Sequence, residues 1–307
     1  MIDVAAAQQR IAPYIHRTPV LQSALLNDLV EAELFFKCEN LQKVGAFKAR
    51  GACNAVLSLS DEDAAKGVAT HSSGNHGAAL AWSAAIRGIP ATIVVPSNAK
   101  QIKKDAILSY GGRIKECEPT LAAREATLAE VVATSGANFI PPYDDDRIIS
   151  GQGTVALEIV EQVDGLDVAI TPVGGGGLLA GCLLGFEESG IAVFGAEPEG
   201  ADDAYRSLKE GARVTSHTPN SLCDGLLTTL GEKNFEIIRD RVTDILLVSD
   251  NEVVEAMSLI WTRLKIVVEP SSAIVLAAVI RNKAQFRGQR IALVLSGGNV
   301  DLTALPF

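Results

Sequence analysis

The sequence lacks the features that mark extracellular, zinc-binding or membrane proteins. Its five cysteines, at positions 38, 53, 117, 182 and 223, are an odd number and form no CxxC pair, so neither a disulfide framework nor a zinc ribbon is indicated. We interpret them as small buried hydrophobes of a protein in a reducing compartment. The longest apolar runs, such as residues 274–280, are far shorter than the roughly 18 residues that a membrane span needs. No membrane partner is therefore expected.

Clustered positive charge is also missing. Acidic residues number 37 against 27 basic ones, the net charge is -10, and the lysines are scattered along the chain. A surface that binds a phosphate backbone gathers Lys and Arg on one face, so no nucleic-acid partner is expected. The first 20 residues include Asp3 and Arg10 and do not have the basic and apolar regions of a signal peptide, which predicts a cytoplasmic protein.

Apolar runs of about five residues alternate with segments of helical period, a pattern typical of parallel strands linked by helices. Predicted strands lie at residues 35–39, 67–72, 91–96, 112–117, 137–142, 167–173, 192–198, 244–249 and 290–296. Predicted helices lie at residues 75–87, 99–109, 120–135, 151–164, 177–188, 251–265 and 271–284. With 307 residues, 48% of them hydrophobic and 5% aromatic, the chain suits a two-domain α/β enzyme.

The stretch at residues 141–147 interrupts this alternation and marks a candidate domain boundary. The strand at 35–39 has no neighbour to pair with locally, so we expect it to join the C-terminal half. The prediction is a small domain of residues 67–143 inserted into a large domain of residues 1–66 and 144–307. A ligand cleft is expected between the two domains.

Four consecutive glycines stand between a predicted strand and a predicted helix: Gly174, Gly175, Gly176 and Gly177. Glycines at such a junction let an anion approach the backbone N–H groups and the helix N-terminus, so we predict a phosphate site. The pattern matches neither GxGxxG nor GxxxxGK[ST], which disfavours a dinucleotide or ATP. The alternative is a tight glycine turn, but one turn needs only one or two glycines.

A second strand-to-helix junction carries Ser72, Ser73, Gly74, Asn75 and His76. Its N–H groups suit a carboxylate, although ordinary helix capping would explain one of the polar residues. Ser296 ends the last predicted strand, where α/β proteins place ligands, or it is simply a turn serine. Lys48 lies among apolar residues, which lowers the pKa of an amine and frees it to condense with an aldehyde. A lysine that extends along the surface is the alternative.

Five stretches now become recognisable: GAFKARGACNAV (45–56), THSSGNHGAALA (70–81), ISGQGT (149–154), PVGGGGLLAG (172–181) and LSGGNVDL (295–302). In order and spacing they resemble the serine/threonine dehydratase and serine racemase family of pyridoxal-phosphate enzymes. The resemblance covers nearly the whole chain. It implies the fold of the tryptophan synthase β-subunit, called fold type II, with the active site between the two domains.

The resemblance also implies how pyridoxal phosphate would be held. Lys48 would form the Schiff base, Phe47 would pack on the pyridine ring, and Asn75 would hydrogen-bond the phenolic oxygen. The glycines at 174–177 would bind the phosphate, and Ser296 would face the ring nitrogen. A neutral hydroxyl at that nitrogen favours loss of a β-substituent over transamination.

The substrate carboxylate would lie against residues 72–76. Lys48 would remove the α proton on one face, and Ser73 could return a proton on the other, which would permit racemisation. Arg124 is a candidate partner for a second carboxylate, as in 3-hydroxyaspartate, or an exposed helical arginine. Tyr143 stands where the family often has Asn or Phe, which leaves the preferred substrate open.

Residues 196–207 resemble the family's divalent-cation loop. Glu197 and Asp203 would supply carboxylates and Ala201 a carbonyl to a structural Mg²⁺, or to Ca²⁺ or Mn²⁺. In the alternative, Asp202 and Asp203 simply start a helix. The resemblance further implies a homodimer.

We therefore predict an ammonia-lyase that removes water from L-serine, L-threonine or 3-hydroxyaspartate to give a 2-oxo acid and ammonia. A serine racemase with dehydratase side activity is the main alternative. A β-replacement synthase usually has Thr-Ser-Gly-Asn-Thr where this chain has Ser-Ser-Gly-Asn-His. A metabolite-binding regulator that catalyses nothing also stays open.

Overall fold

The computed structural model describes residues 2–72 and 74–306. The strands are β1 (Val20–Leu21), β2 (Glu33–Cys38), β3 (Val68–His71), β4 (Ala91–Pro96), β5 (Arg113–Cys117), β6 (Asn138–Phe139), β7 (Val168–Pro172), β8 (Ala192–Pro198), β9 (Asp244–Val248) and β10 (Arg290–Leu295). The helices are α1 (Val4–Ile11), α2 (Ala24–Val30), α3 (Lys48–Leu57), α4 (Asp61–Ala65), α5 (Asn75–Arg87), α6 (Gln101–Ser109), α7 (Leu121–Ser135), α8 (Asp146–Gln162), α9 (Gly177–Gly185), α10 (Asp203–Glu210), α11 (Glu232–Arg241), α12 (Asp250–Arg263), α13 (Pro270–Arg281) and α14 (Lys283–Phe286). Short 3₁₀ turns that matter below are η1 (Glu39–Leu41), η3 (Glu199–Ala201) and η4 (Asp224–Leu226).

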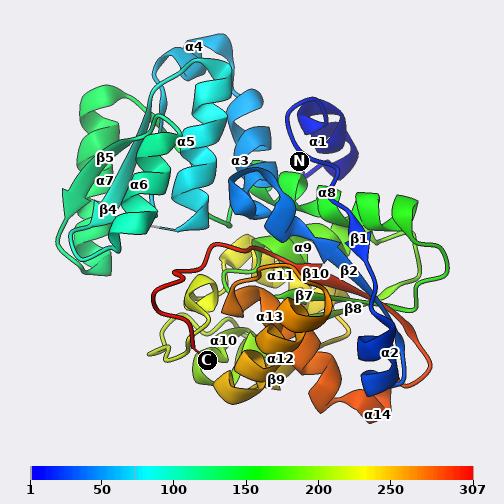
Figure 1. Cartoon of the computed structure of the whole chain (residues 1–307). Helices are drawn as coiled ribbons and strands as arrows, with labels where there is room; N and C mark the ends of the chain where they lie inside the picture. The colour runs from blue at the N-terminus through cyan, green and yellow to red at the C-terminus, as the bar shows by residue number, and fades with distance from the viewer. Residues whose placement is uncertain (1, 73, 307) are drawn as a thin grey trace.

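Two sheets organise these elements (Figure 1). The larger has the strand order β1-β2-β10-β7-β8-β9, and the smaller has the order β5-β4-β3-β6. All the strand pairs described are parallel except β1 with β2. The predicted parallel α/β class is therefore confirmed. The strand predicted at 35–39 pairs with β10, as expected for a segment that joins the C-terminal half.

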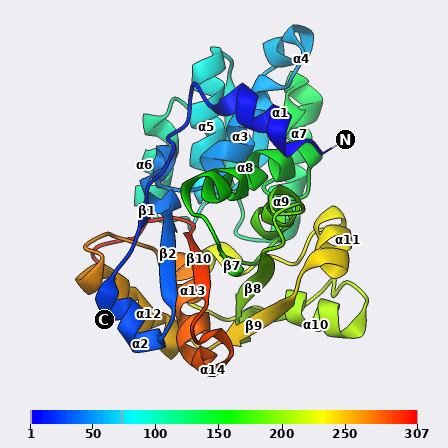
Figure 2. The same cartoon turned by 90° about the vertical axis from the view of Figure 1, so that its right-hand side faces the viewer.

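Helices cover both faces of the larger sheet (Figure 2). Side chains of a strand alternate between its two faces. Val168 and Ile170 of β7 accordingly pack in one cluster with α2, α12 and α13, whereas Ala169 packs in another with α8 and α9. The sheet is buried on both faces, and its parallel strands end at a common edge, where the connecting loops meet.

The smaller sheet is covered by α5 and α6 on one face and by α7 on the other. Helix α3 packs between α5, which covers the smaller sheet, and α8, which covers the larger one. The division into residues 1–66 with 144–307 and residues 67–143 stays a prediction.

Several elements differ from the sequence-based expectation. Helix α8 begins at Asp146 rather than at residue 151, because the side chain of Asp145 caps it by accepting from the Arg147 N–H. The strand predicted at 137–142 is reduced to β6. The patterns above do not predict α3, because every residue from Ala49 to Val56 is buried and no polar face marks a helical period. Helices α2, α4, α10 and α11 were likewise not predicted.

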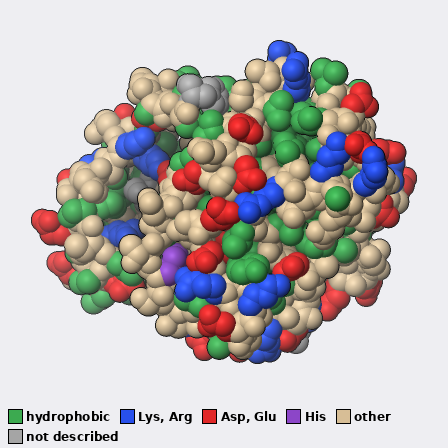
Figure 3. Space-filling view, turned by 90° about the horizontal axis from the view of Figure 1, so that it is seen from below, with side chains coloured by type: hydrophobic (Ala, Val, Ile, Leu, Met, Phe, Trp, Pro, Cys, Tyr) green, Lys and Arg blue, Asp and Glu red, His purple; other side chains and the backbone are tan. Residues whose placement is uncertain are grey.

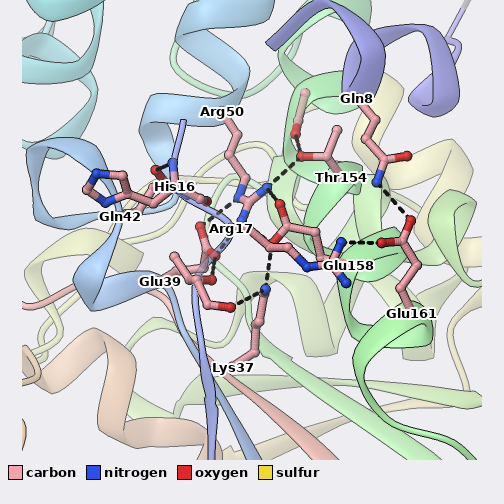
Figure 4. A network of polar contacts seen from close by, with 12 residues as sticks. Gln8, His16, Arg17, Lys37, Glu39, Gln42, Arg50, Thr154, Glu158 and Glu161 are labelled. Atoms are coloured by element: carbon pink, nitrogen blue, oxygen red, sulfur yellow. Dashed lines mark hydrogen bonds and ion pairs between the residues drawn. The ribbon is translucent and has the colours of Figure 1, made fainter. Parts of the chain in front are cut away.

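A buried ion cluster of Lys37, Glu39, Arg50 and Glu158 joins α3 to the larger sheet (Figure 4). The Arg50 guanidinium is fully buried and donates to both oxygens of Glu39, at 2.7 and 2.8 Å, and to both oxygens of Glu158, at 2.8 and 2.9 Å. Lys37 Nζ adds a bond to Glu158 of 2.5 Å. Two cations thus balance two carboxylates, and Arg50 is paired with both of them.

We expect Arg50→Met to lower the free energy of unfolding of the cofactor-free protein by about 3–5 kcal/mol, because it leaves two buried carboxylates with one cation. Urea unfolding followed by far-UV circular dichroism measures the change. Arg239 is the matched control, since its ion pair with Asp240 is exposed. Arg239→Met should change stability by less than about 0.5 kcal/mol. An equal effect of both substitutions would contradict the importance of the cluster.

Candidate active site

Lys48 is the first residue of α3 and lies beside the end of β10. The N–H of Phe47 donates to the carbonyl of Ser296 at 3.0 Å, and Ala46 forms a β-bridge with Gly297. Ser296 itself is buried. Two segments that are distant in the sequence are therefore joined by backbone bonds, which bring Lys48, Phe47 and Ser296 together.

The amine of Lys48 is in an environment that favours its neutral form. The side chain is half-buried, and Nζ lies 5.1 Å from the centre of the Phe47 ring. Removal from water lowers the pKa of Lys48 to about 8, although the negative charge of Glu269 partly opposes this. Nζ donates to the carbonyl of Pro142 at 2.7 Å. An amine with this pKa is deprotonated in useful amounts near neutral pH.

The four glycines form a buried loop between β7 and α9. Nothing in the described part of the chain accepts a hydrogen bond from the N–H groups of Gly174, Gly175, Gly176 or Gly177. Buried amide donors are rarely left unpaired, so this loop has the chemistry of an anion site. Gly176 has a φ of +89°, which only glycine adopts readily. A Cβ on Gly175 would come within 2.4 Å of the Tyr143 ring, so packing also requires glycine there.

The loop between β3 and α5 contains the predicted carboxylate-binding residues. Ser73 lies outside the described residues. Ser72 Oγ accepts from the N–H of Gly74 at 3.3 Å. His76 is buried and its Nε2–H donates to the carbonyl of Ile140 at 3.1 Å. Burial and then the charge of Lys48 lower the pKa of His76 to about 3, so its ring is neutral and holds the loop in place.

Asn75 starts α5 and makes two contacts that the sequence did not indicate. Its Nδ2 donates to both carboxylate oxygens of Glu269, at 3.0 and 3.2 Å, and its Oδ1 accepts from Asn299 Nδ2 at 2.9 Å. Asn299 belongs to the same Ser-Gly-Gly-Asn stretch as Ser296, which was a usable signal. No sequence pattern indicated Glu269, since a glutamate before a helix-starting proline is a common surface pattern.

Arg124 is a half-buried residue of α7 rather than an exposed helical arginine. Its Nε is buried and has no hydrogen-bond partner among the described residues. His71, at the end of β3, stacks on Phe139 with 6.2 Å between ring centres. Burial and then the charge of Arg124 lower the pKa of His71, which means that the two side chains are close. Arg124, with a donor that no described residue uses, thus lies near His71, the residue that precedes the loop at 72–76.

The loop predicted to bind a cation holds two buried carboxylates. Glu197, in β8, accepts from the N–H groups of Ala204 and Tyr205 at 2.9 and 2.8 Å. Asp203 Oδ2 accepts from the N–H of Leu230 at 2.8 Å, whereas its Oδ1 has no hydrogen-bond partner among the described residues. Burial raises the pKa of both carboxyls.

Ala201 is buried in η3, and His217 Nε2 lies 3.4 Å from Asp203. Among the described residues no group of three or more His, Cys, Asp or Glu side chains is close enough to hold a metal. Leu230 connects this loop to the glycine loop, because its N–H donates to Asp203 and its side chain would lie 2.5 Å from a Cβ on Gly176. The N–H of Gly231 donates to the carbonyl of Gly175 at 3.1 Å.

A cavity of about 540 Å³ adjoins Asn75. Helices α5 and α6 form one wall, and η4 and residues 299–306 form the other. Outside the cavity, Lys and Arg side chains are interspersed with Asp and Glu on the face drawn in Figure 3, with no broad patch of one sign. No helix in the described part of the chain is long and apolar enough to cross a membrane.

Comparison with known proteins agrees with this geometry. Residues 11–297 match the family model described as pyridoxal-phosphate dependent enzyme. The chain is 51% identical to beta-hydroxyaspartate dehydratase of Paracoccus denitrificans, over 99% of this chain and 98% of the other. It is 46% identical to serine racemase of Dictyostelium discoideum, over 99% and 95%.

The solved structures agree as well. Maize serine racemase superposes with a TM-score of 0.96 at 45% identity, covering 98% of this chain and 93% of the other. Threonine deaminase of T.th. gives 0.94 at 41% identity, covering 98% of each chain. The predicted fold type II is thus confirmed, and so is the prediction of an enzyme that uses pyridoxal phosphate. The chain belongs to the family of pyridoxal-phosphate dependent enzymes.

Proposed function

We propose that this protein is an ammonia-lyase that removes water from a β-hydroxy amino acid, with 3-hydroxyaspartate as its preferred substrate. The observation that carries the proposal is a half-buried lysine of lowered pKa at the same edge of the sheet as a loop whose four amide donors have no acceptor among residues 2–72 and 74–306. An aldehyde cofactor with a phosphate satisfies both. Relatives named beta-hydroxyaspartate dehydratase and L-threo-3-hydroxyaspartate ammonia-lyase, 51% and 45% identical, support the substrate class.

The residues present fit the cofactor. Lys48 supplies the amine, Phe47 a flat apolar wall, and residues 174–177 the phosphate donors. Asn75 and Ser296 supply the polar groups for the phenolic oxygen and the ring nitrogen. When bound, pyridoxal phosphate supplies an electron sink for the negative charge that develops at the α carbon.

The chain's own residues then carry the proton steps. The N–H groups of residues 72–76, at the start of α5, hold the substrate carboxylate, and the helix dipole stabilises its charge. Lys48, neutral above a pKa of about 8, takes the α proton. The β-hydroxyl leaves as water, and the unsaturated amine that is released hydrolyses to a 2-oxo acid and ammonia. The neutral hydroxyl of Ser296 favours this elimination over transamination.

We assign the second carboxylate of 3-hydroxyaspartate to Arg124, with His71 beside it. The buried, unpaired Nε of Arg124 supports this, because an arginine fork with a free donor is the group that best matches a carboxylate. L-Serine has no such carboxylate and would leave that donor unused.

Racemisation of serine is the second candidate function. Serine racemases of Dictyostelium discoideum and Arabidopsis thaliana, 46% and 49% identical, favour it, and Ser73 is the proposed proton donor on the face opposite Lys48. One incubation with L-serine, in which pyruvate and D-serine are both quantified, separates the two activities. D-Serine in excess of pyruvate would reverse our assignment.

We further propose a structural divalent cation, Mg²⁺ or else Ca²⁺ or Mn²⁺, held by Glu197, Asp203 and the carbonyl of Ala201. Two buried carboxylates with raised pKa values support it, since a cation would supply positive charge. Asp203 Oδ1 has no hydrogen bond among the described residues and only the contact with His217 Nε2 at 3.4 Å. Because Leu230 connects Asp203 to Gly176, a cation here would also stiffen the phosphate site.

A cytoplasmic location and a homodimer complete the proposal. Five free cysteines, four of them buried, support a reducing compartment. Light scattering of the purified protein tests the dimer.

Lys48→Ala should abolish both the visible absorbance of the bound cofactor and the release of 2-oxo acid, because no other amine replaces it. Lys115→Ala is the control, since Lys115 is exposed on β5. Absorbance spectra and a coupled keto-acid assay measure the two effects. A colourless wild-type protein, or an active Lys48→Ala variant, would overturn the assignment.

Arg124→Ala should raise the KM for 3-hydroxyaspartate about tenfold or more through loss of one charged pair, and change turnover of L-serine by less than about threefold. The exposed Arg113 gives the control Arg113→Ala. Steady-state kinetics with both substrates is the measurement. An equal loss with both substrates would show that Arg124 does not recognise the second carboxylate.

Chelation with EDTA should lower the melting temperature, and re-addition of Mg²⁺, Ca²⁺ or Mn²⁺ should restore it. A cation at about 100 times its Kd contributes about 2.7 kcal/mol. Asp203→Asn should lose this response, and Asp202→Asn should keep it. Identical melting curves for the chelated and loaded protein would exclude the cation site.

A further inference from the structure

The carboxylate of Glu269 is buried where three segments of the chain meet. Only 6% of the residue is exposed. It accepts from Asn75 Nδ2 of α5 and, at 3.2 Å, from the backbone N–H of Asn299. The third segment is η4, where a Cβ on Gly225 would come within 3.9 Å of Glu269 Oε1. Glu269 is also the acidic group that acts on the pKa of Lys48.

These contacts determine which way the Asn75 amide points. Asn299 Nδ2 donates to the carbonyl of Val44 at 2.8 Å, and a carbonyl can only accept, so this end of Asn299 must be its nitrogen. The same nitrogen donates to Asn75 Oδ1, which leaves Nδ2 of Asn75 facing Glu269. An ionised carboxylate also only accepts, so both neighbours impose one orientation.

The chain around Glu269 is shaped to admit its carboxylate. A Cβ on Gly297 would lie 2.8 to 3.0 Å from the carboxylate atoms, so no larger residue fits there. The N–H of Glu269 donates to the carbonyl of Gly297 at 3.0 Å. Gly297 therefore leaves space for the carboxylate of Glu269 as well as forming a turn.

We propose that Glu269 is a positioning residue of the reaction, whose ionised carboxylate locks the Asn75 amide so that its second N–H is presented to the cofactor. The inference rests on the proposed role of Asn75 at the cofactor's phenolic oxygen. One N–H of Nδ2 is held by Glu269, and the other is left for that oxygen. Protonation of Glu269 would replace one of its two acceptor oxygens by a hydroxyl, so the Asn75 amide, still held at its oxygen by Asn299, would lose one of its two bonds to the carboxylate and be positioned less firmly.

Charged groups on three elements face this carboxylate: Lys48 of α3, Asp224 of η4 and Lys103 of α6. Burial raises the pKa of Glu269 to about 7, Asp224 adds to the rise, and the bonds from Asn75 and Asn299 together with Lys103 oppose it. Glu269 thus holds the Asn75 amide most firmly above about pH 7 and less firmly below it.

The effect of pH on the stability of the fold distinguishes a positioning role of Glu269 from a purely structural one. The unfolded carboxyl titrates near 4.5 and the folded one near 7, so the folded state loses stability as the pH rises between these values. A neutral glutamine avoids that loss. A residue retained for stability alone would not be an acid here.

The test compares wild type and Glu269→Gln, both loaded with pyridoxal phosphate, from pH 6 to pH 8. The ratio of wild-type kcat to that of Glu269→Gln should rise roughly tenfold, which is the change in ionised fraction of one group with a pKa of about 7. Lys48 titrates near pH 8 in both proteins, so its contribution to the two profiles largely cancels in this ratio. The melting temperature of the variant relative to wild type should increase from pH 5 to pH 8. Glu255→Gln, at an exposed position of α12, should follow wild type.

A wild-type profile that fits the titration of Lys48 near pH 8 alone, or a Glu269→Gln profile parallel to that of wild type, overturns the inference. The wild-type titration gives this answer even if the variant does not fold. A wild type with no cofactor absorbance and no turnover would instead reject the proposed function. If wild type is coloured and active while the ratio of the two kcat values does not change with pH, only the role of Glu269 fails.

Discussion

The buried ion cluster around Arg50 is the interaction on which the site depends. Arg50 lies two residues after Lys48 and is bound by the carboxylates of Glu39, in η1, and Glu158, in α8. Removing such groups from water is costly unless each is paired, so the cluster tolerates only one arrangement of these elements. The side chain of Lys48 is long and flexible, but the cluster fixes the start of α3, and with it the backbone of Lys48, between the two sheets.

Three parallel strands end near Lys48. β3, β7 and β10 end at Ser72, the glycine loop and Ser296, and each ending exposes backbone donors or a hydroxyl rather than a charged side chain. Parallel strands within a sheet end at one edge, which is why α/β proteins bind ligands there. The contact of Phe47 with Ser296 joins the segments that follow β2 and β10, and that of Asn75 with Asn299 then joins the two sheets across the site.

Burial sets the charge state of the groups at this edge. It lowers the pKa of Lys48 and of His76 and raises that of Glu269. The pKa of the lysine thereby comes within reach of neutral pH, the histidine is neutral, and the acid titrates near the pH at which the reaction would run. These states arise because the same closely packed segments that hold the groups together also exclude water from them.

The sequence by itself determined the kinds of element, the parallel class of the fold and the stretches that carry chemistry. Hydrophobic period and glycine placement are local properties, so the strands ending before Ser72 and Gly174 could be predicted. The roles proposed for Lys48 and the glycine loop rest on residue type and order. Fully buried helices such as α3 could not be found in this way, because they have no polar face.

Only the tertiary structure decided which distant residues meet. It paired Arg50 with Glu158, brought Glu269 to Asn75, and placed the half-buried Arg124 near His71. Each contact joins segments whose separation in the chain bears no relation to their distance in space. Strand order and helix packing set that distance, and one sequence does not encode them in any local pattern. The physical reason is that a side chain's partner, and with it the pKa, depends on what else is buried there.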